Sequence, residues 1–189
     1  MRESGILMHI TSLPAPYGIG TMGKDAYAFV DFLVRAGQRY WQILPLTPTG
    51  YGDSPYQSLG ACAGNHYLID LDRLADEGLL KKEEIQNISW GSNPARVDFG
   101  AMYAHRMNVL RQAFQRFTPD GAYETFVEQN RSWLEDYALF TALKDTLGGK
   151  PWLDWPEDLR LRKADALAEK RRELSEEIRL QFFAQYEFD

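Results

Sequence analysis

The first 71 residues alternate short apolar runs with loops rich in proline and glycine. Apolar runs at 5–10 and 40–44 predict two buried strands. Between them, apolar residues recur at helical spacing, with Asp25 as the candidate N-cap and Gly37 as the stop signal. That apolar helix face consists of Ala26, Phe29, Leu33 and Ala36. The order of strand, helix and strand predicts a βαβ unit of a parallel sheet.

A third apolar run at 67–71 is a possible strand, and Asp72 is the candidate N-cap of the helix that follows. Between the run at 40–44 and this one lie roughly twenty residues, many of them Gly, Pro, Ser, Asp and Tyr. Loops of this length usually carry function. In parallel α/β units the working loops leave the carboxyl ends of the strands, and this long loop does so.

From residue 72 onward the sequence is charged and mostly helical in its spacing. One amphipathic pattern ends at the turn 118–121, and a second ends at Gly148-Gly149, before a rigid tryptophan-rich connector at 150–156. The first is marked by Leu110, Phe114 and Phe117, and the second by Trp133, Tyr137, Phe140, Leu143 and Leu147. A third helical pattern starts at Ala164 and has no stop signal, so we expect the chain to be truncated there.

These patterns predict three parts. We expect the first barrel strands and their binding loops at 1–71, a mostly helical inserted subdomain at 72–163, and the start of a helix returning to the barrel at 164–189. Two or three parallel strands cannot close a barrel, whose eight strands typically need ~250 residues. The chain is therefore expected to be the N-terminal part of a longer one.

Composition and charge narrow the class of protein. The chain has 44% apolar and 25% charged residues, and no apolar run approaches the ~18 residues that span a bilayer, so we expect a cytoplasmic, non-membrane protein. A net charge of −6 argues against nucleic acid and anionic membranes as partners. The single cysteine, Cys62, excludes an internal disulfide and a multi-cysteine metal site, and we expect a buried or bystander thiol.

The long loop holds the most informative polar and aromatic side chains. Asp53, Ser54 and Tyr56 place a carboxylate, a hydroxyl and an aromatic face within four residues, a combination suited to a polyhydroxylated ligand. Alternatively, Asp53 and Ser54 satisfy the backbone of a turn while Tyr56 packs against the rest of the protein. The spacing alone leaves both interpretations open.

Other candidate motifs carry less information. Gly18, Gly20 and Gly23 have Gly-x-Gly-x-x-Gly spacing, but two prolines precede them and no acidic residue ends the second strand, which disfavours nucleotide binding. The alternative is that these glycines let the backbone pass close to other loops. No pair of histidines has metal-ligand spacing; we expect His9 at a rim or in the core and His105 in solvent.

Several longer motifs occur in order along the chain. They are Ser-Leu-Pro-Ala-Pro-Tyr-Gly-Ile-Gly at 12–20, Trp-Gln-Ile-Leu-Pro-Leu at 41–46, Thr-Gly-Tyr-Gly-Asp-Ser-Pro-Tyr-Gln at 49–57, Ala-Gly-Asn at 63–65 with Leu-Ile-Asp-Leu at 68–71, Val-Asp-Phe at 97–99, and Trp-Leu-Glu-Asp-Tyr-Ala-Leu-Phe at 133–140. The sequence resembles the amylomaltase family of 4-alpha-glucanotransferases, or disproportionating enzymes, over essentially its whole length. His66 departs from the family, which usually has proline there.

The resemblance implies an interrupted (β/α)8 TIM barrel with an inserted helical subdomain. It also implies an enzyme that moves a segment of an α-1,4-glucan to a 4-hydroxyl of glucose or another glucan, through a retaining covalent mechanism. The catalytic carboxylates of the family lie beyond residue 189, so we assign no catalytic residue and expect this chain alone to be inactive. We expect no metal and no organic cofactor. The implied partners are α-1,4-glucans and maltooligosaccharides, with no obligate protein partner.

The resemblance also assigns roles within the long loop. Tyr56 resembles the tyrosine that stacks on the sugar next to the scissile bond, Ser54 a hydroxyl contact on the acceptor side, and Tyr51 an aromatic residue of the outer groove. Asp53 is interpreted as a residue that fixes the loop. Two alternatives remain open: a non-catalytic α-glucan-binding module, and an α-glucan hydrolase of the same barrel class.

Overall fold

A computed structural model describes residues 2–50 and 52–189 and is mostly helical. Contacts within the chain divide it into two units, Met1–Phe117 together with Phe188, and Thr118–Glu187 together with Asp189. The predicted boundaries after residues 71 and 163 concern the whole barrel and stay a prediction.

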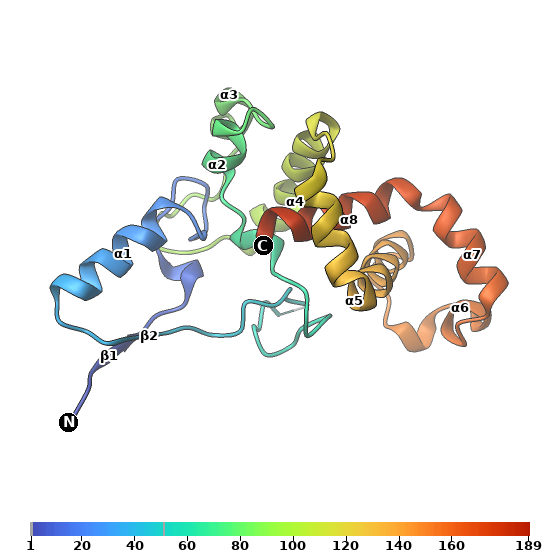
Figure 1. The fold of residues 1–189 in the computed structure, drawn as a ribbon, viewed down its shortest axis with the longest axis horizontal. Coiled ribbons are helices and arrows are strands. Elements are labelled where there is room, and N and C mark those ends of the chain that lie inside the picture. The colour runs from blue at the N-terminus through green and yellow to red at the C-terminus, as the bar shows by residue number, and fades with distance from the viewer. Residues whose placement is uncertain (1, 51) are drawn as a thin grey trace. The chain divides into compact units, whose positions relative to one another are not determined.

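The first unit contains a two-stranded parallel sheet. Strand β1 (Gly5–Leu7) pairs with β2 (Tyr40–Gln42), with Gly5 opposite Tyr40 and Leu7 opposite Gln42. Helix α1 (Lys24–Arg35) connects them, as the blue part of the ribbon in Figure 1 shows. The predicted βαβ order is confirmed. The strands are shorter than predicted, however. The expectation that they are buried is wrong here, because all residues of β1 are exposed and only Trp41 of β2 is partly buried.

Glycines flank helix α1 on both sides. Its N-cap is Gly23 rather than the predicted Asp25, which lies in the first turn instead. Gly37 has a φ of 69° and ends the helix as predicted, with the amide of Gln38 donating to the carbonyl of Leu33 at 2.9 Å. The buried side of α1 carries Leu33, while its outer side is apolar too.

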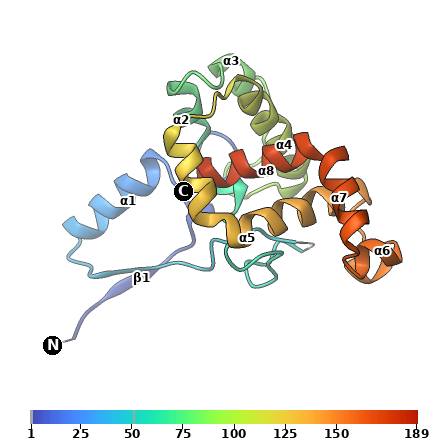
Figure 2. The same ribbon diagram turned by 45° about the vertical axis from the view of Figure 1, so that its right-hand side comes forward.

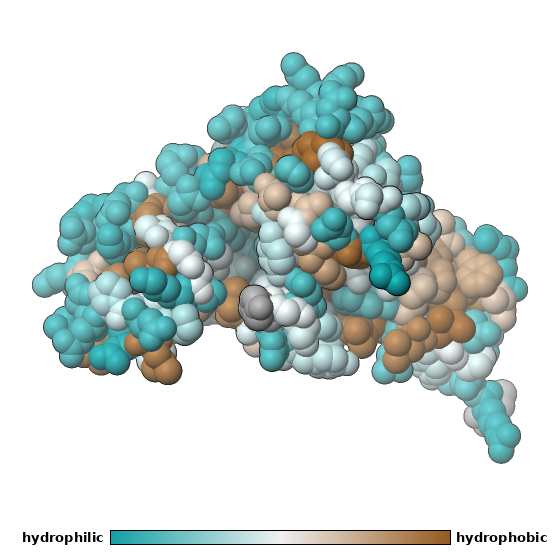
Figure 3. Space-filling model, turned by 180° about the vertical axis from the view of Figure 1, so that it is seen from behind, coloured by the Kyte–Doolittle hydropathy of each residue, from teal (hydrophilic) through white to brown (hydrophobic). Residues whose placement is uncertain are grey.

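Large apolar side chains are exposed on α1 and on the strands. They are Ile6, Leu7, Tyr27, Val30, Phe32, Val34 and Tyr40. In the space-filling view, hydrophobic side chains gather on the right-hand part of the surface, where these elements lie (Figure 3). A contiguous apolar surface of this kind is normally covered by further protein.

The prediction of a third strand at 67–71 is wrong. The segment forms a 3-10 helix, η2 (His66–Leu68), followed by α2 (Leu71–Asp76). Side-chain acceptors favour these helical turns: Asn65 accepts from the amide of Tyr67 at 3.0 Å, and Asp70 accepts from that of Arg73 at 3.0 Å. Asp70 is therefore the N-cap of α2, and the prediction of Asp72 as the cap is also wrong.

The remaining helices of the first unit are η1 (Ile10–Ser12), α3 (Lys82–Gln86) and α4 (Phe99–Arg116). The sequence pattern detected only the last two turns of α4, which begins at the N-cap Asp98. One core cluster brings residues from the start of the unit into contact with Phe188, near the end of the chain. Its buried residues are Ile10, Leu13 and Leu68, and the residues packed against them are Met8, Ala26, Phe29, Trp41, Leu46 and Phe188.

The second unit consists of helices alone among its described residues. They are α5 (Gly121–Thr146), η3 (Trp152–Asp154), α6 (Glu157–Arg160), α7 (Ala164–Glu173) and α8 (Ser175–Phe188). Figure 2 shows α5 and α8 side by side. The rings of Tyr123 and Tyr186 lie 5.4 Å apart, and Leu143 and Leu174 belong to one core cluster, so the two helices run antiparallel. The single helix predicted from residue 164 onward is broken at Leu174.

Two further predictions concern membranes and Cys62. Among the described residues, no helix is long and apolar enough to cross a membrane. Cys62 is exposed, so of the two interpretations of this thiol the buried one is wrong.

Candidate functional site

The loop at 49–58 is closed on itself. An antiparallel bridge joins Thr49 to Ser58, and two turns lie between them. In the first turn the amide of Asp53 donates to the carbonyl of Gly50 at 3.1 Å; in the second, the amide of Gln57 donates to the carbonyl of Ser54 at 3.1 Å. The loop is thus a compact surface element, which we call the 49–58 loop.

The predicted binding residues occupy different places on the 49–58 loop. The side chain of Tyr56 is 72% exposed, which leaves its ring free to take a flat ligand. Ser54 is partly buried, and its Oγ lies 3.4 Å from the amide of Tyr56. Asp53 is partly buried and accepts a hydrogen bond from the hydroxyl of Tyr103. Tyr51, the fourth predicted residue, lies outside the described residues.

Asp53 has an unusual backbone conformation, with a φ of 57°, and Gly52 before it has a φ of 89°. The left-handed region is costly for most side chains but is tolerated by glycine and, better than by others, by Asn and Asp. Glycine at position 52 and aspartate at position 53 are therefore both suited to the positive φ angles of this turn. That backbone directs the Asp53 carboxylate toward α4.

Tyr103 on α4 was not anticipated from the sequence. Its hydroxyl donates to Oδ1 of Asp53 and lies 3.3 Å from the carbonyl oxygen of Gly50. Partial burial, together with the hydrogen bond and the negative charge of Asp53, raises the pKa of Tyr103 to about 12. The phenol is therefore protonated, and able to donate, across the whole neutral range.

Two buried side chains support this part of α4. The ring of Tyr67 lies edge-on to that of Tyr103, 5.9 Å away. Arg106, one turn further along α4 and fully buried, donates through Nη2 to the carbonyl oxygens of Tyr67, at 3.0 Å, and Ile69. Burial lowers the pKa of Arg106 to about 10, so it still carries its charge at neutral pH. The helix thus holds both the 49–58 loop and the segment that follows it.

Sequence reasoning missed Arg106 although a signal was present. The buried face of α4 consists of Met102, Arg106, Val109, Leu110 and Ala113. An arginine in the middle of an apolar helical stripe indicates a buried cation with backbone or acidic partners. Tyr103 lies beside that stripe and gives no comparable signal.

The histidines do not form a catalytic or metal-binding group. Burial and the charge of Arg106 lower the pKa of His66 to about 4, so its imidazole is neutral at neutral pH. Burial also lowers the pKa of His9. His105 is half-buried with its ring 6.2 Å from that of Trp90, so the expectation that it is solvated is wrong. Among the described residues no three His, Cys, Asp or Glu side chains gather as metal ligands would.

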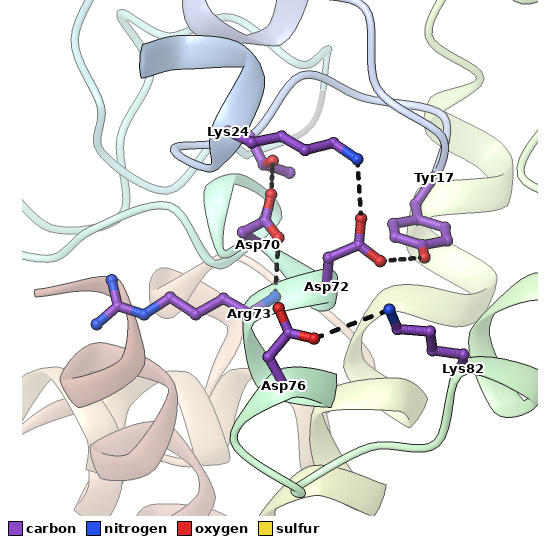
Figure 4. A network of polar contacts seen from close by, with 8 residues as sticks. Tyr17, Lys24, Asp70, Asp72, Arg73, Asp76 and Lys82 are labelled. Atoms are coloured by element: carbon purple, nitrogen blue, oxygen red, sulfur yellow. Dashed lines mark hydrogen bonds and ion pairs between the residues drawn. The ribbon is translucent and has the colours of Figure 1, made fainter. Parts of the chain in front are cut away.

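A second loop, at 13–23, lies against the start of α2 (Figure 4). Asp72 accepts from the hydroxyl of Tyr17 at 2.6 Å and lies 3.6 Å from Nζ of Lys24, and Asp70 accepts from Thr21 at 2.6 Å. A Cβ at Gly23 would overlap the Asp70 carboxylate. The glycine there permits a close approach of two loops, as the alternative to nucleotide binding predicted.

The 13–23 loop also lines a surface pocket. It has a volume of about 740 Å³ and lies within the first unit. Its walls are the 13–23 loop on one side and the connector between α3 and α4 on the other, with Pro14, Tyr17, Trp90 and Arg96 among the lining residues. Of the described residues of the 49–58 loop, none of Asp53, Ser54 and Tyr56 lines it.

Comparison with known proteins places the chain in a class of carbohydrate-active enzymes. A glycoside hydrolase family profile described as 4-alpha-glucanotransferase matches residues 8–189, so the chain belongs to that family. The 4-alpha-glucanotransferase of Thermus thermophilus is 49% identical over 193 residues, which is 99% of this chain and 38% of that protein. The 4-alpha-glucanotransferase of Streptococcus pneumoniae is 47% identical over 191 residues, again 99% of this chain and 38% of that protein.

A comparison with solved structures also finds a protein of this family. Amylomaltase from Streptococcus agalactiae, solved in complex with acarbose, superposes with a TM-score of 0.94 and 46% identity, covering 100% of this chain and 39% of that one. The chain therefore spans less than two fifths of the length of the relatives it matches.

Proposed function

We propose that the whole protein to which this chain belongs is a 4-alpha-glucanotransferase. It would move a segment of an α-1,4-glucan to a 4-hydroxyl of glucose or of another glucan, with retention through a covalent glycosyl-enzyme. The observation that carries the proposal is the family match over residues 8–189, supported by the superposition on an amylomaltase that binds acarbose. Its substrates would be α-1,4-glucans and maltooligosaccharides.

The contribution of this chain would be to hold the glucan. The exposed ring of Tyr56 would stack on a sugar face, Ser54 would contact an acceptor hydroxyl, and Tyr51 would belong to the outer part of the groove. Asp53 would fix the loop, since its carboxylate already accepts from Tyr103.

The chemistry itself needs a nucleophile and an acid–base residue, with their carboxyl groups ~5 to 5.5 Å apart. We place both beyond residue 189 and expect no metal or organic cofactor in the reaction. The enzyme would act in the cytoplasm.

The architecture of the whole protein would be an interrupted (β/α)8 barrel. Strands β1 and β2 would be its first two strands, residues 72–163 an inserted helical subdomain, and residues 164–189 the return to the barrel. The exposed apolar residues of β1 and α1 support this, because the later strands and helices of a barrel would cover them.

The test is to incubate the whole protein with maltotriose. A glucanotransferase produces glucose together with maltodextrins longer than the substrate. Accumulation of glucose and maltose alone would identify a hydrolase of the same barrel class instead. Titrating this chain by itself with maltoheptaose examines the remaining alternative: saturable binding by a chain that unfolds cooperatively would favour an independent glucan-binding module.

A further inference from the structure

We propose that Trp152 is a surface contact for long α-glucan chains, formed by the second unit. The side chain lies in η3, within the tryptophan-rich connector at 150–156. The contact uses none of the residues of the 49–58 loop, which belong to the first unit. The identity of the ligand as an α-glucan rests on the proposed function, whereas the open aromatic surface rests on the structure of the second unit.

Trp152 differs from the other four tryptophans of the chain in two respects. Trp41, Trp90, Trp133 and Trp155 are buried or partly buried, whereas 46% of Trp152 is exposed. Each of those four also donates its indole N–H to an oxygen atom of the protein, at 2.7 to 3.1 Å. The indole of Trp152 has no hydrogen-bond or ring partner among the described residues. Its ring face and its N–H are therefore both available to a ligand.

The backbone that carries Trp152 is held in place by its neighbours. The amide of Trp155 donates to the carbonyl of Trp152 at 3.2 Å and closes the turn. The indole N–H of Trp155 donates to the carbonyl of Lys150 at 3.1 Å, and its ring stacks on Phe140 at 5.2 Å. Nζ of Lys144 donates to the same carbonyl of Lys150 at 3.2 Å. An aromatic residue on an ordered backbone loses little conformational entropy when a ligand binds.

The side chains around Trp152 favour a sugar as its ligand. Lys150, Asp154 and Glu157 are exposed and charged, and the carboxylates of Asp154 and Glu157 have no partner among the described residues. Burying these charges against another protein surface would be costly. The hydroxyl groups of a sugar can instead donate to the carboxylates, while its C–H face covers the indole ring.

The surface around Trp152 also differs from the exposed apolar surface of α1 and the strands. That surface borders a sheet of two strands, the described part of which has unpaired outer edges that further strands would complete. The second unit has a core cluster of its own, in which Trp155 and Leu159 belong with Leu139 and Leu143. Trp152 is therefore not a missing part of that core.

The experiment measures the KM of the whole protein for soluble amylose, with glucose as the acceptor, and for maltotriose. In Trp152→Ala the KM for amylose should rise about tenfold relative to the KM for maltotriose. The reason is that only a chain that extends past the reacting sugars gains from a further contact. Trp152→Phe keeps a ring face but loses the N–H, so it should raise this ratio less. The melting temperature should be nearly unchanged in both variants, because an exposed ring leaves no cavity.

The matched control is Leu153→Ala. Leu153 is the next residue of the same turn and is 67% exposed, so this variant also removes an exposed apolar side chain from η3. It should leave the ratio of the two KM values unchanged. An equal effect of Leu153→Ala and Trp152→Ala would assign the effect to lost apolar surface and would overturn stacking on the indole.

Quenching of tryptophan fluorescence by acrylamide gives a readout that does not depend on turnover. The fluorescence of Trp152 is the difference between the unmodified protein and Trp152→Phe. In the absence of glucan this component should be quenched readily, because the ring is exposed. Soluble amylose should protect it in a saturable manner.

The outcomes distinguish this contact from the proposed function. If the unmodified protein does not redistribute maltotriose, the proposed function fails, while protection by amylose still decides whether Trp152 binds glucan. If it does redistribute maltotriose, but the KM ratio of Trp152→Ala is unchanged and amylose gives no protection, the contact alone is overturned. A component that is not quenched without glucan, or is quenched less as the protein concentration rises, would also overturn it. The first result would assign Trp152 to packing against the rest of the chain, and the second to contact with a second copy.

Discussion

The buried guanidinium of Arg106 donates a hydrogen bond to the backbone carbonyl oxygen of Tyr67, at 3.0 Å. The same Nη2 also bonds the carbonyl of Ile69. Residues 67–69 belong to no strand or long helix that would provide hydrogen-bond donors for their buried carbonyl groups. The side chain of Arg106 provides these donors instead. Its Nε and Nη1 have no hydrogen-bond partner among the described residues, so the arrangement also carries a cost.

Replacing Arg106 by methionine should destabilise the protein by roughly 2 to 3 kcal/mol, because two buried carbonyl groups lose their donor. The loss is limited because burying the guanidinium is itself unfavourable. Chemical unfolding of the two proteins measures the difference. Lysine at this position should recover part of it, since an ammonium group can reach at least one of the carbonyls.

The control for that prediction is Arg116→Met. Arg116 forms a bidentate ion pair with Glu84, at 2.6 and 2.7 Å, on the surface of the first unit. Arg116 also donates to the carbonyl of Leu79 at 3.1 Å. An ion pair at the surface contributes little, so this variant should lose clearly less stability than the Arg106 variant. Equal losses for the two variants would contradict a special role of the buried arginine.

Tyr56→Ala should lower kcat/KM on maltotriose on the order of tenfold or more, since the stacking surface is lost, while the melting temperature stays nearly the same. The ring is exposed, so its removal leaves no cavity. Phenylalanine at this position keeps the aromatic face and should retain most of the activity. Unaltered kinetics for Tyr56→Ala would exclude stacking.

The βαβ unit was predictable because its signals are local. Apolar spacing and a terminal glycine at position 37 define α1, and two short apolar runs flank it. The strand at 67–71 was predicted wrongly because apolar composition does not distinguish a strand from a short helical segment. Asn65 and Asp70 decided the outcome through their hydrogen bonds to nearby amides.

The candidate site was predictable only in part. Sequence reasoning located the loop and the exposed Tyr56 because loop length, aromatic content and family motifs all point there. It missed Tyr103, because a tyrosine beside the apolar stripe of a helix looks the same whether or not its hydroxyl reaches a carboxylate fifty residues away. Contacts at that separation are set by tertiary packing, which no local pattern records.

Gly23→Ala should destabilise the protein by roughly 1 to 3 kcal/mol, because the added methyl group would overlap the Asp70 carboxylate and displace the N-cap of α2. Gly121→Ala is the matched control. Gly121 is the first residue of α5, has an ordinary φ and has open space where its Cβ would lie, so alanine there should be neutral or slightly stabilising. Thermal unfolding distinguishes the two, and equal behaviour would contradict the close approach of the loop to α2.

His66 should make stability depend on pH in the acid range. Burial and the charge of Arg106 lower its pKa from 6.5 to about 4, so between these values the unfolded chain binds more protons than the folded one. The favourable contribution of the neutral imidazole is therefore complete above pH 6.5 and is lost as the pH falls toward 4.

The size of that loss is on the order of 3 kcal/mol at most. Urea unfolding measured at several pH values between 8 and 4 tests this. As the pH is lowered, the unmodified protein should lose this stability relative to His66→Gln, whose side chain does not titrate. Subtracting the two curves removes the contribution of the carboxylates. Parallel curves over the whole range would show that His66 does not titrate differently in the folded and unfolded states, and that the charge of Arg106 does not affect it.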